Sequence, residues 1–313
     1  MSTPTDTRSI LVIKLGALGD FIFAQPAFEA IRRQHAGDRL VLLTIPALAD
    51  LGRRCGRFDA VWTDPRGRSP AAYWAIRRMI RGGGFARVYD LQTQKRTNRY
   101  FYSLFPGPWP EWSGTAWGCS HPDHTPDRRT LPGPERYARQ LAPLGITVAP
   151  WPDMGWLDAD IGRFALPPGP FALLIPGSSP DRTDKRWPVD RYAALAERLA
   201  DRGMTPVVLG GAGEADLAAR IRAQCPQAVD LTGRTGLADI AGLARRAACA
   251  VGNDTGPTHL VGAVGTPSLV LLSDAFPIFQ SVGRNAAPLY HPSFDTMDVD
   301  EVLAAVTLRM AAV

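Results

Sequence analysis

Two patterns of apolar and polar residues alternate along the first half of the chain. Short, mainly apolar runs fall at 10–14, 40–44, 60–62 and 88–91. Between them lie longer segments, such as 71–81, whose apolar residues recur every three or four positions. Buried strands that alternate with amphipathic helices are typical of a parallel sheet wound by helices, so we predict such a sheet here.

The second half of the chain repeats this alternation. Its strand-like runs are 171–175, 206–209, 248–251 and 268–272, and its helix-like segments are 189–202, 214–223 and 238–246. Residues 144–169 are rich in Pro, Gly and Trp, which is typical of a linker. We therefore expect α/β domains at 1–160 and 161–297, followed by a helix at 298–313 that packs back on the N-terminal domain.

Composition limits the classes of function. The chain has 313 residues, of which 45% are hydrophobic and 21% are charged, as in an ordinary globular protein of two domains. No apolar run approaches the roughly 20 residues needed to cross a bilayer, so we expect a cytoplasmic protein. Lys and Arg number 35 against 30 for Asp and Glu, which favours anionic partners but is too small an excess to imply nucleic acid.

The polar segment 253–259 lies between two apolar runs near the C-terminus. Polar groups placed between buried strands cost stability unless they bind something, so this segment is a candidate ligand site. A simpler explanation is that Asp254 or Thr255 caps a helix that runs from His259 through Val264. The segment by itself leaves both explanations open.

A second candidate site, 14–20, directly follows the first strand. Gly16 and Gly19 allow a tight turn and the close approach of a ligand, but the third glycine of a dinucleotide-binding fingerprint does not fit. Ordinary nicotinamide binding is therefore disfavoured, and we predict that Asp20 accepts a proton from a hydroxyl group. Alternatively, Asp20 caps the following helix, which Pro26 would kink or restart.

Two further strand ends carry candidate ligand groups. Ser178 and Ser179 lie in a small turn whose backbone N–H groups suit a phosphate, and Lys185 could stabilise a departing diphosphate. Alternatively, Lys185 and Arg186 form a solvated charge pair before a helix. Glu214 follows a glycine-rich turn, where its carboxylate could accept hydrogen bonds from ribose hydroxyls or simply favour a helix start.

Taken together, segments 13–20, 176–188, 232–243 and 252–267 resemble those of glycosyltransferase family 9, the heptosyltransferases of lipopolysaccharide synthesis. The resemblance implies the GT-B arrangement, in which two Rossmann-like domains with parallel sheets face each other across a cleft. It also implies that the N-terminal half binds the acceptor and the C-terminal half binds the nucleotide sugar. The donor would be an ADP-sugar with a heptose-like sugar, and the acceptor a glycan or glycolipid.

Functional residues carry over from the family by position. Asp20 matches the catalytic base, and Lys185 matches a lysine near the donor phosphates. The residues implied to bind the donor are Gly19, Ser178, Ser179, Glu214, Asp254, Thr255, Gly256 and His259. Those implied to meet a phosphorylated acceptor are Lys95, Arg96 and Arg99, although a solvated helix face would explain them as well.

The expected reaction is an inverting displacement that needs neither a metal ion nor a cofactor. The Asp-x-Asp pattern at 158–160 lies in the presumed linker, where we expect a solvated turn. We expect no nucleic-acid partner and at most peripheral association with the inner face of the inner membrane. Two alternatives stay open: a catalytically silent nucleotide-sugar-binding protein and a Rossmann oxidoreductase.

One proline-rich stretch, 105–134, departs from the heptosyltransferase pattern. It is too long for an ordinary connection, so we expect an irregular substrate loop there. Its tryptophans, Trp109, Trp112 and Trp117, could stack on sugar faces or pack the loop down. This departure puts a lipopolysaccharide acceptor in question.

Overall fold

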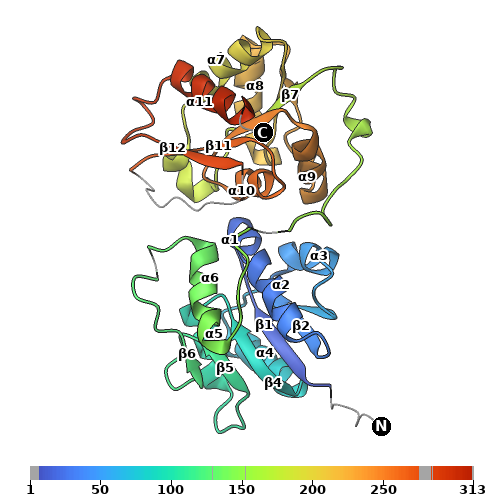
Figure 1. Ribbon diagram of the computed structural model, residues 1–313, viewed down its shortest axis with the longest axis vertical. Helices are drawn as coiled ribbons and strands as arrows, with labels where there is room; N and C mark the ends of the chain where they lie inside the picture. Colours follow the sequence, from blue (N-terminus) through green and yellow to red (C-terminus); the bar gives the residue numbers. More distant parts are fainter. Residues whose placement is uncertain (1–6, 129, 152, 275–282, 284, 312–313) are drawn as a thin grey trace. The chain divides into compact units, whose positions relative to one another are not determined.

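The computed structural model describes residues 7–128, 130–151, 153–274, 283 and 285–311. The chain divides into two compact units, Met1–Pro152 and Asp153–Val313 (Figure 1). The second unit thus begins before the expected boundary at 161. Residues of the presumed linker explain this difference, because Met154, Leu157 and Phe164 are buried within the second unit.

The described part of the first unit contains a parallel six-stranded sheet in the order β3-β2-β1-β4-β5-β6. The strands are β1 (Ser9–Ile13), β2 (Arg39–Thr44), β3 (Ala60–Thr63), β4 (Phe85–Asp90), β5 (Glu111–Gly114) and β6 (His121–Pro122). The helices are α1 (Leu18–Phe23), α2 (Gln25–Gln34), α3 (Pro46–Arg54), α4 (Pro70–Gly82), α5 (Lys95–Ser103) and α6 (Gly133–Leu141). Strand order reverses between β1 and β4, and ligands of such sheets bind at the carboxyl ends of the strands at this point.

The second unit has the same topology. In its described residues the sheet order is β12-β11-β10-β7-β8-β9, and all neighbouring strands are parallel. The strands are β7 (Phe171–Ile175), β8 (Thr205–Val208), β9 (Val229–Asp230), β10 (Cys249–Asn253), β11 (Ser268–Leu272) and β12 (Ala286–Tyr290). The helices are α7 (Val189–Ala200), α8 (Ala215–Gln224), α9 (Leu237–Arg246), α10 (Gly256–Ala263) and α11 (Val299–Ala311). Strand order reverses here between β10 and β7.

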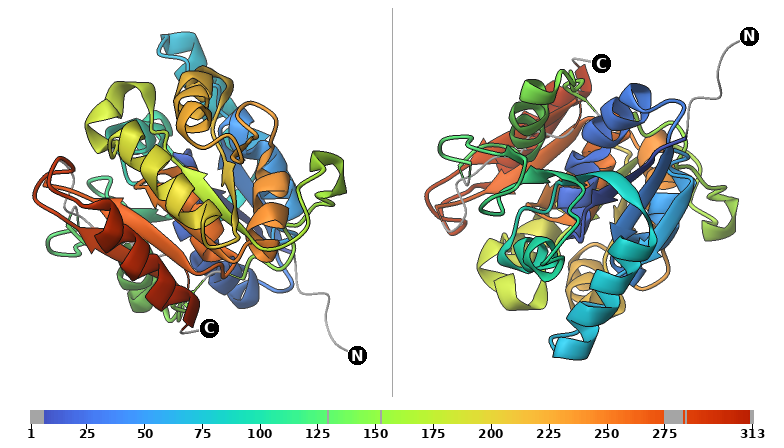
Figure 2. Two further views of the ribbon diagram at one scale, coloured as in Figure 1. Left: turned by 90° about the horizontal axis from the view of Figure 1, so that it is seen from above. Right: turned by 90° about the horizontal axis from the view of Figure 1, so that it is seen from below.

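Helices cover both faces of each sheet (Figures 1 and 2), which explains the uninterrupted apolar runs of the central strands. In β7 and β11 every residue is buried. The C-terminal helix α11 contacts α7, β10, β11 and β12. It therefore packs within the second unit, and its expected return to the N-terminal domain stays a prediction. Among the described residues, no helix is long and apolar enough to cross a bilayer.

The stretch 105–134 is more regular than expected. It contains β5, β6 and the start of α6. The two short strands pair in parallel beside β4 and so extend the edge of the first sheet. Trp112 of β5 is fully buried and packs edge-to-face on Phe101 at 5.4 Å between ring centroids. Trp117, in contrast, is 88% exposed, so packing explains only part of this aromatic segment.

Candidate functional site

Asn253, the last residue of β10, joins the loops at the carboxyl ends of the second sheet. Its side chain is fully buried. Its Nδ2 donates to the carbonyl oxygens of Pro176 at 2.8 Å and Gly177 at 3.2 Å. Its Oδ1 accepts from the backbone N–H of Trp187 and the hydroxyl of Tyr192, both at 3.1 Å. One amide thus fixes the loop after β7 and the start of α7 against β10.

Asp254 follows and forms the centre of a charged cluster. Its Oδ2 lies 2.7 Å from Lys185 Nζ, and its Oδ1 lies 3.0 Å from His259 Nε2. The three side chains are only 8%, 13% and 6% exposed, respectively. Lys185 is therefore not a solvated charge, and Asp254 is not a helix cap. Thr255 is the N-cap residue of α10 by position, but its side chain makes no capping hydrogen bond.

The charged cluster of Lys185, Asp254 and His259 keeps Asp254 ionised. Burial by itself raises the pKa of the Asp254 carboxyl, but the hydrogen bonds and charges of His259 and Lys185 outweigh it and hold the pKa below its usual value. A cation and an imidazole therefore stand beside the N-terminus of α10, where backbone N–H groups favour an anion. This arrangement can bind a phosphate group and a hydroxyl-bearing ligand side by side.

Ser178 is tied into its own loop. Its hydroxyl donates to the carbonyl oxygen of Arg182 at 2.8 Å and accepts from Arg186 Nε at 2.9 Å. Arg186 also donates to the Ser178 carbonyl oxygen at 3.2 Å, so the interpretation of Arg186 as a solvated charge is wrong. Ser179 is exposed beside it. The Ser178 side chain thus shapes the loop, and a phosphate would meet the backbone and Ser179.

Glu214 lies against this same loop although it follows β8. Its Oε2 accepts from the backbone N–H of Gly211 at 2.8 Å. A Cβ added at Gly177 would lie 1.7 Å from Glu214 Oε1, so this approach requires glycine at position 177. The structure thereby brings Glu214, the Ser178 loop and the charged cluster to one edge of the second sheet. The ribose contact of Glu214 stays a prediction.

Asp20 lies in the first turn of α1, in the first unit, with Gly19 buried beside it. Lys14 Nζ lies 4.0 Å from its Oδ2, and Arg136 Nη2 lies 3.9 Å from its Oδ1. The carboxylate is 32% exposed and is not the N-cap of α1. It can therefore receive a proton from a bound molecule. The predicted restart at Pro26 is confirmed, since α1 ends at Phe23 and α2 begins at Gln25.

A cavity of about 670 Å³ opens beside this carboxylate in the first unit. Its lining is polar and basic and consists of Gln92, Thr93, Gln94, Lys95, Arg96, Asn98, Thr115, Arg128 and Arg136. Two of the three predicted acceptor residues, Lys95 and Arg96, line it. The third, Arg99, instead donates to the hydroxyl of Tyr73 at 3.3 Å.

The sequence interpretation missed Arg128 and Arg136 of this cavity. Arg136 belongs both to the cavity and to the surroundings of Asp20. Its buried Nε has no hydrogen-bond partner among the described residues. Such a donor is costly unless a ligand meets it, which points to an anionic or hydroxyl-rich molecule here. Arg96 is less available, because Asp64 holds its Nε at 2.9 Å.

Asp90, at the end of β4, makes the free energy of unfolding depend on pH. It is fully buried, its Oδ1 accepts from the backbone N–H of Thr93 at 2.9 Å, and its Oδ2 has no partner among the described residues. Burial raises its pKa from 3.8 to about 6, against the smaller opposing effect of its hydrogen bonds. The folded state therefore keeps a proton that the unfolded state releases between these two values.

We predict that Asp90 lowers the free energy of unfolding by about 3 kcal/mol as the pH rises from 3.8 through 6. Urea unfolding of wild type and Asp90→Asn at pH 4 and pH 7.5 measures this, because the variant lacks the ionisation. The stability of the variant relative to wild type should increase with pH. A constant difference between the two proteins would contradict the assignment.

Comparisons with known proteins show which proteins the chain resembles. Residues 155–284 match the family model described as glycosyltransferase family 9 (heptosyltransferase). The chain is 33% identical over 98 residues to lipooligosaccharide heptosyltransferase 2 of Haemophilus influenzae, a match covering 30% of this chain and 28% of that protein. It is 32% identical over 135 residues to lipopolysaccharide heptosyltransferase 1 of Pseudomonas aeruginosa, covering 42% and 37%. The matches thus span less than half of these curated relatives.

The fold is shared over a greater length. The Escherichia coli heptosyltransferase WaaC, solved with ADP, superimposes with a TM-score of 0.75 over 96% of this chain and 99% of that chain, at 19% identity. The expected α/β fold class, with its two parallel sheets in the GT-B class, is therefore confirmed.

Proposed function

We propose that this protein, whose residues 155–284 match the model of glycosyltransferase family 9, transfers a heptose-like sugar from an ADP-sugar to a hydroxyl group of a glycan or glycolipid. The observation that carries the proposal is the buried cluster of Lys185, Asp254 and His259 at the N-terminus of α10. Comparable sites in open α/β sheets bind phosphate groups and polar ligands at this edge.

In this proposal the donor binds to the second unit. Lys185 and the N–H groups at the start of α10 and in the Ser178 loop hold the diphosphate, while Asp254 and His259 accept and donate hydrogen bonds to sugar hydroxyls. Glu214, next to Gly177, takes the ribose hydroxyls. ADP is the favoured nucleotide because the superimposed WaaC structure contains it.

In the proposed reaction, the Asp20 carboxylate accepts the proton of the acceptor hydroxyl as its oxygen bonds to the anomeric carbon. The bond from that carbon to the diphosphate breaks at the same time, with inversion, through an oxocarbenium-like state. ADP leaves with the bonding electrons. Lys185 and the helix N-terminus stabilise its growing charge, which is where fixed electrostatics lower a barrier most.

The acceptor site in this proposal is the basic cavity of the first unit. Its residues Lys95, Arg128 and Arg136 suit an acceptor that carries phosphate or carboxylate groups. Arg136 would orient that acceptor beside Asp20, since its guanidinium borders both. An anionic or hydroxyl oxygen of the acceptor would also provide a partner for the buried Nε of this arginine.

A thermal-shift screen tests the donor assignment. We expect ADP to stabilise the protein, by about 2.7 kcal/mol when its concentration is 100 times its Kd, and NAD⁺ to have a much smaller effect. Release of ADP from an ADP-sugar in the presence of an acceptor then tests catalysis. Stabilisation by NAD⁺ but not by ADP would favour the oxidoreductase alternative, and ADP-sugar binding without turnover would favour a silent binding protein.

A further inference from the structure

Exposed aromatic residues gather on one part of the first unit. The large hydrophobic residues exposed there are Trp74, Tyr102, Phe105, Trp109 and Trp117, with exposed fractions from 44% to 88%. In the described part of the second unit only Tyr290 and Leu308 are comparable. We call the five residues of the first unit the aromatic patch. An apolar patch of this kind on a monomer marks an interaction site.

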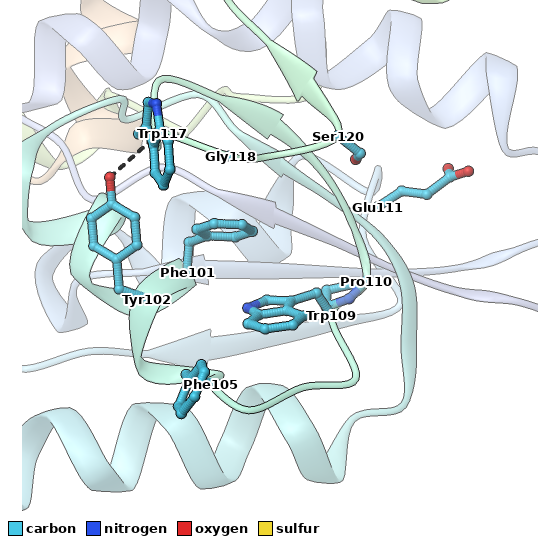
Figure 3. A pocket seen from close by; sticks show the side chains of 9 residues that line it. All are labelled: Phe101, Tyr102, Phe105, Trp109, Pro110, Glu111, Trp117, Gly118 and Ser120. Carbon is cyan, nitrogen blue, oxygen red and sulfur yellow. Dashed lines mark hydrogen bonds between the residues drawn. The ribbon is translucent and has the colours of Figure 1, made fainter.

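Four residues of the aromatic patch, all except Trp74, line a hollow. Phe101 forms its base, 5.7 Å from the Tyr102 ring and 6.3 Å from the Trp109 ring between centroids. The hydroxyl of Tyr102 accepts from the backbone N–H of Trp117 at 2.9 Å, which holds the Trp117 turn at the rim (Figure 3). The hollow measures about 630 Å³. Its lining is mainly carbon; the polar side chains that also line it are Glu111, which pairs with Arg87, and Ser120, whose hydroxyl accepts from the backbone N–H of Trp112.

Arginines of α4 border the aromatic patch. Trp74, Arg77, Arg78 and Arg81 recur at helical spacing, so they share one face of α4. Arg77 donates to the carbonyl oxygen of Phe105 at 3.3 Å, which sets this face against the patch. Arg78 lies over the Trp74 ring, 5.1 Å from its centroid.

Charge is concentrated in the same part of the chain. Residues 70–122 contain seven Lys and Arg and two Asp and Glu, a difference of five, which equals the formal net charge of +5 for the whole protein. Arg87 pairs with Glu111, and Arg96 pairs with Asp64. Among the described residues the remaining cations have no carboxylate partner; these are Arg77, Arg78, Arg81, Lys95 and Arg99.

We propose that the aromatic patch and the neighbouring α4 arginines dock on the surface of an anionic lipid bilayer. Tryptophan and tyrosine prefer the boundary between headgroups and acyl chains, and arginines beside them meet the anionic headgroups. A second copy of this chain fits less well, because it would set the same excess of positive charge against itself. A nucleic acid fits less well, because the hollow is apolar. The proposal does not depend on the glycosyl transfer proposed above.

Co-sedimentation of the full chain with vesicles tests this proposal. We expect binding to vesicles that contain phosphatidylglycerol, weaker binding to pure phosphatidylcholine, and loss of binding as the salt concentration rises. Trp117→Ser should lower the affinity about tenfold, since it removes one large aromatic side chain from the interface. Arg78→Gln should lower it about fivefold, as expected for one cation near an anionic surface.

Leu308→Ser is the matched control, because this residue is 72% exposed on α11 of the other unit. It should bind vesicles like wild type. Equal affinity of wild type, Trp117→Ser and Arg78→Gln would overturn the proposal. An absence of vesicle binding would also overturn it. Self-association in sedimentation equilibrium would then favour a second copy of this chain, and binding to an oligothymidylate would favour a nucleic acid. Because vesicle binding is measured without donor or acceptor, failure here is distinguishable from failure of the proposed transferase activity.

Discussion

Replacing Asp20 with asparagine is expected to lower the rate of glycosyl transfer by about 10²- to 10⁴-fold, the usual contribution of a positioned general base. The amide has the same shape but cannot take the proton of the acceptor hydroxyl. Release of ADP from an ADP-sugar, measured with saturating acceptor, gives the rate. Donor binding should not change, because the proposed donor residues all lie in the second unit, except Gly19.

Asp50→Asn is the matched control for Asp20→Asn. Asp50 is 72% exposed and pairs with Arg54 at 2.8 Å on α3, so its replacement removes one carboxylate from the same unit without touching the proposed site. Its activity should equal that of wild type. If Asp20→Asn and Asp50→Asn were equally active, the assignment of Asp20 as the base would be wrong.

Replacing Asp254 with asparagine is expected to lower the free energy of unfolding by about 3 kcal/mol. Lys185, only 13% exposed, would lose its buried countercharge at 2.7 Å. The midpoint of thermal unfolding should fall by about 6–12 °C for a domain of this size. The stabilising effect of ADP should also disappear if this cluster binds the donor, which a thermal-shift assay with and without ADP measures.

The pKa of Asp254 sets the pH range of this effect. Because the folded state lowers this pKa, the ion pair contributes fully above the unfolded value of 3.8 and is lost as the pH falls through the lower folded value. Asp190→Asn provides the control, since Asp190 is 76% exposed in its pair with Arg220. This variant should lower the free energy of unfolding by under about 1 kcal/mol. Equal losses for the two variants would refute a special role for Asp254.

Strands with continuous apolar runs were predictable from sequence. The expected strands 171–175 and 268–272 coincide with β7 and β11, because both faces of these strands are covered by helices. The edge strand β5 was not predictable. Its sequence, Glu111–Gly114, carries no apolar run, and it is a strand because β4 offers free hydrogen-bonding groups beside it.

Some residues of the candidate site could also be predicted from the sequence, and others could not. Asp20, Lys185 and Asp254 could be named in advance, since each lies next to the carboxyl end of a predicted strand or in a motif that resembles the family. Arg136 could not, because it belongs to α6 and approaches Asp20 across more than a hundred residues of chain. Sequence spacing carries no information about such a contact.

The amino-acid sequence by itself determined the two α/β halves and the glycine-rich and charged turns at their strand ends, because hydrophobic period and turn chemistry are local properties. Only the tertiary structure decided which of those turns meet. It paired Lys185 with Asp254, fixed Asn253 between three segments, and used the Ser178 hydroxyl within its own loop. It also brought the α4 arginines against the backbone carbonyl oxygens of Phe105 and Gly107. These are contacts between distant segments, and packing of the two sheets with their helices creates them.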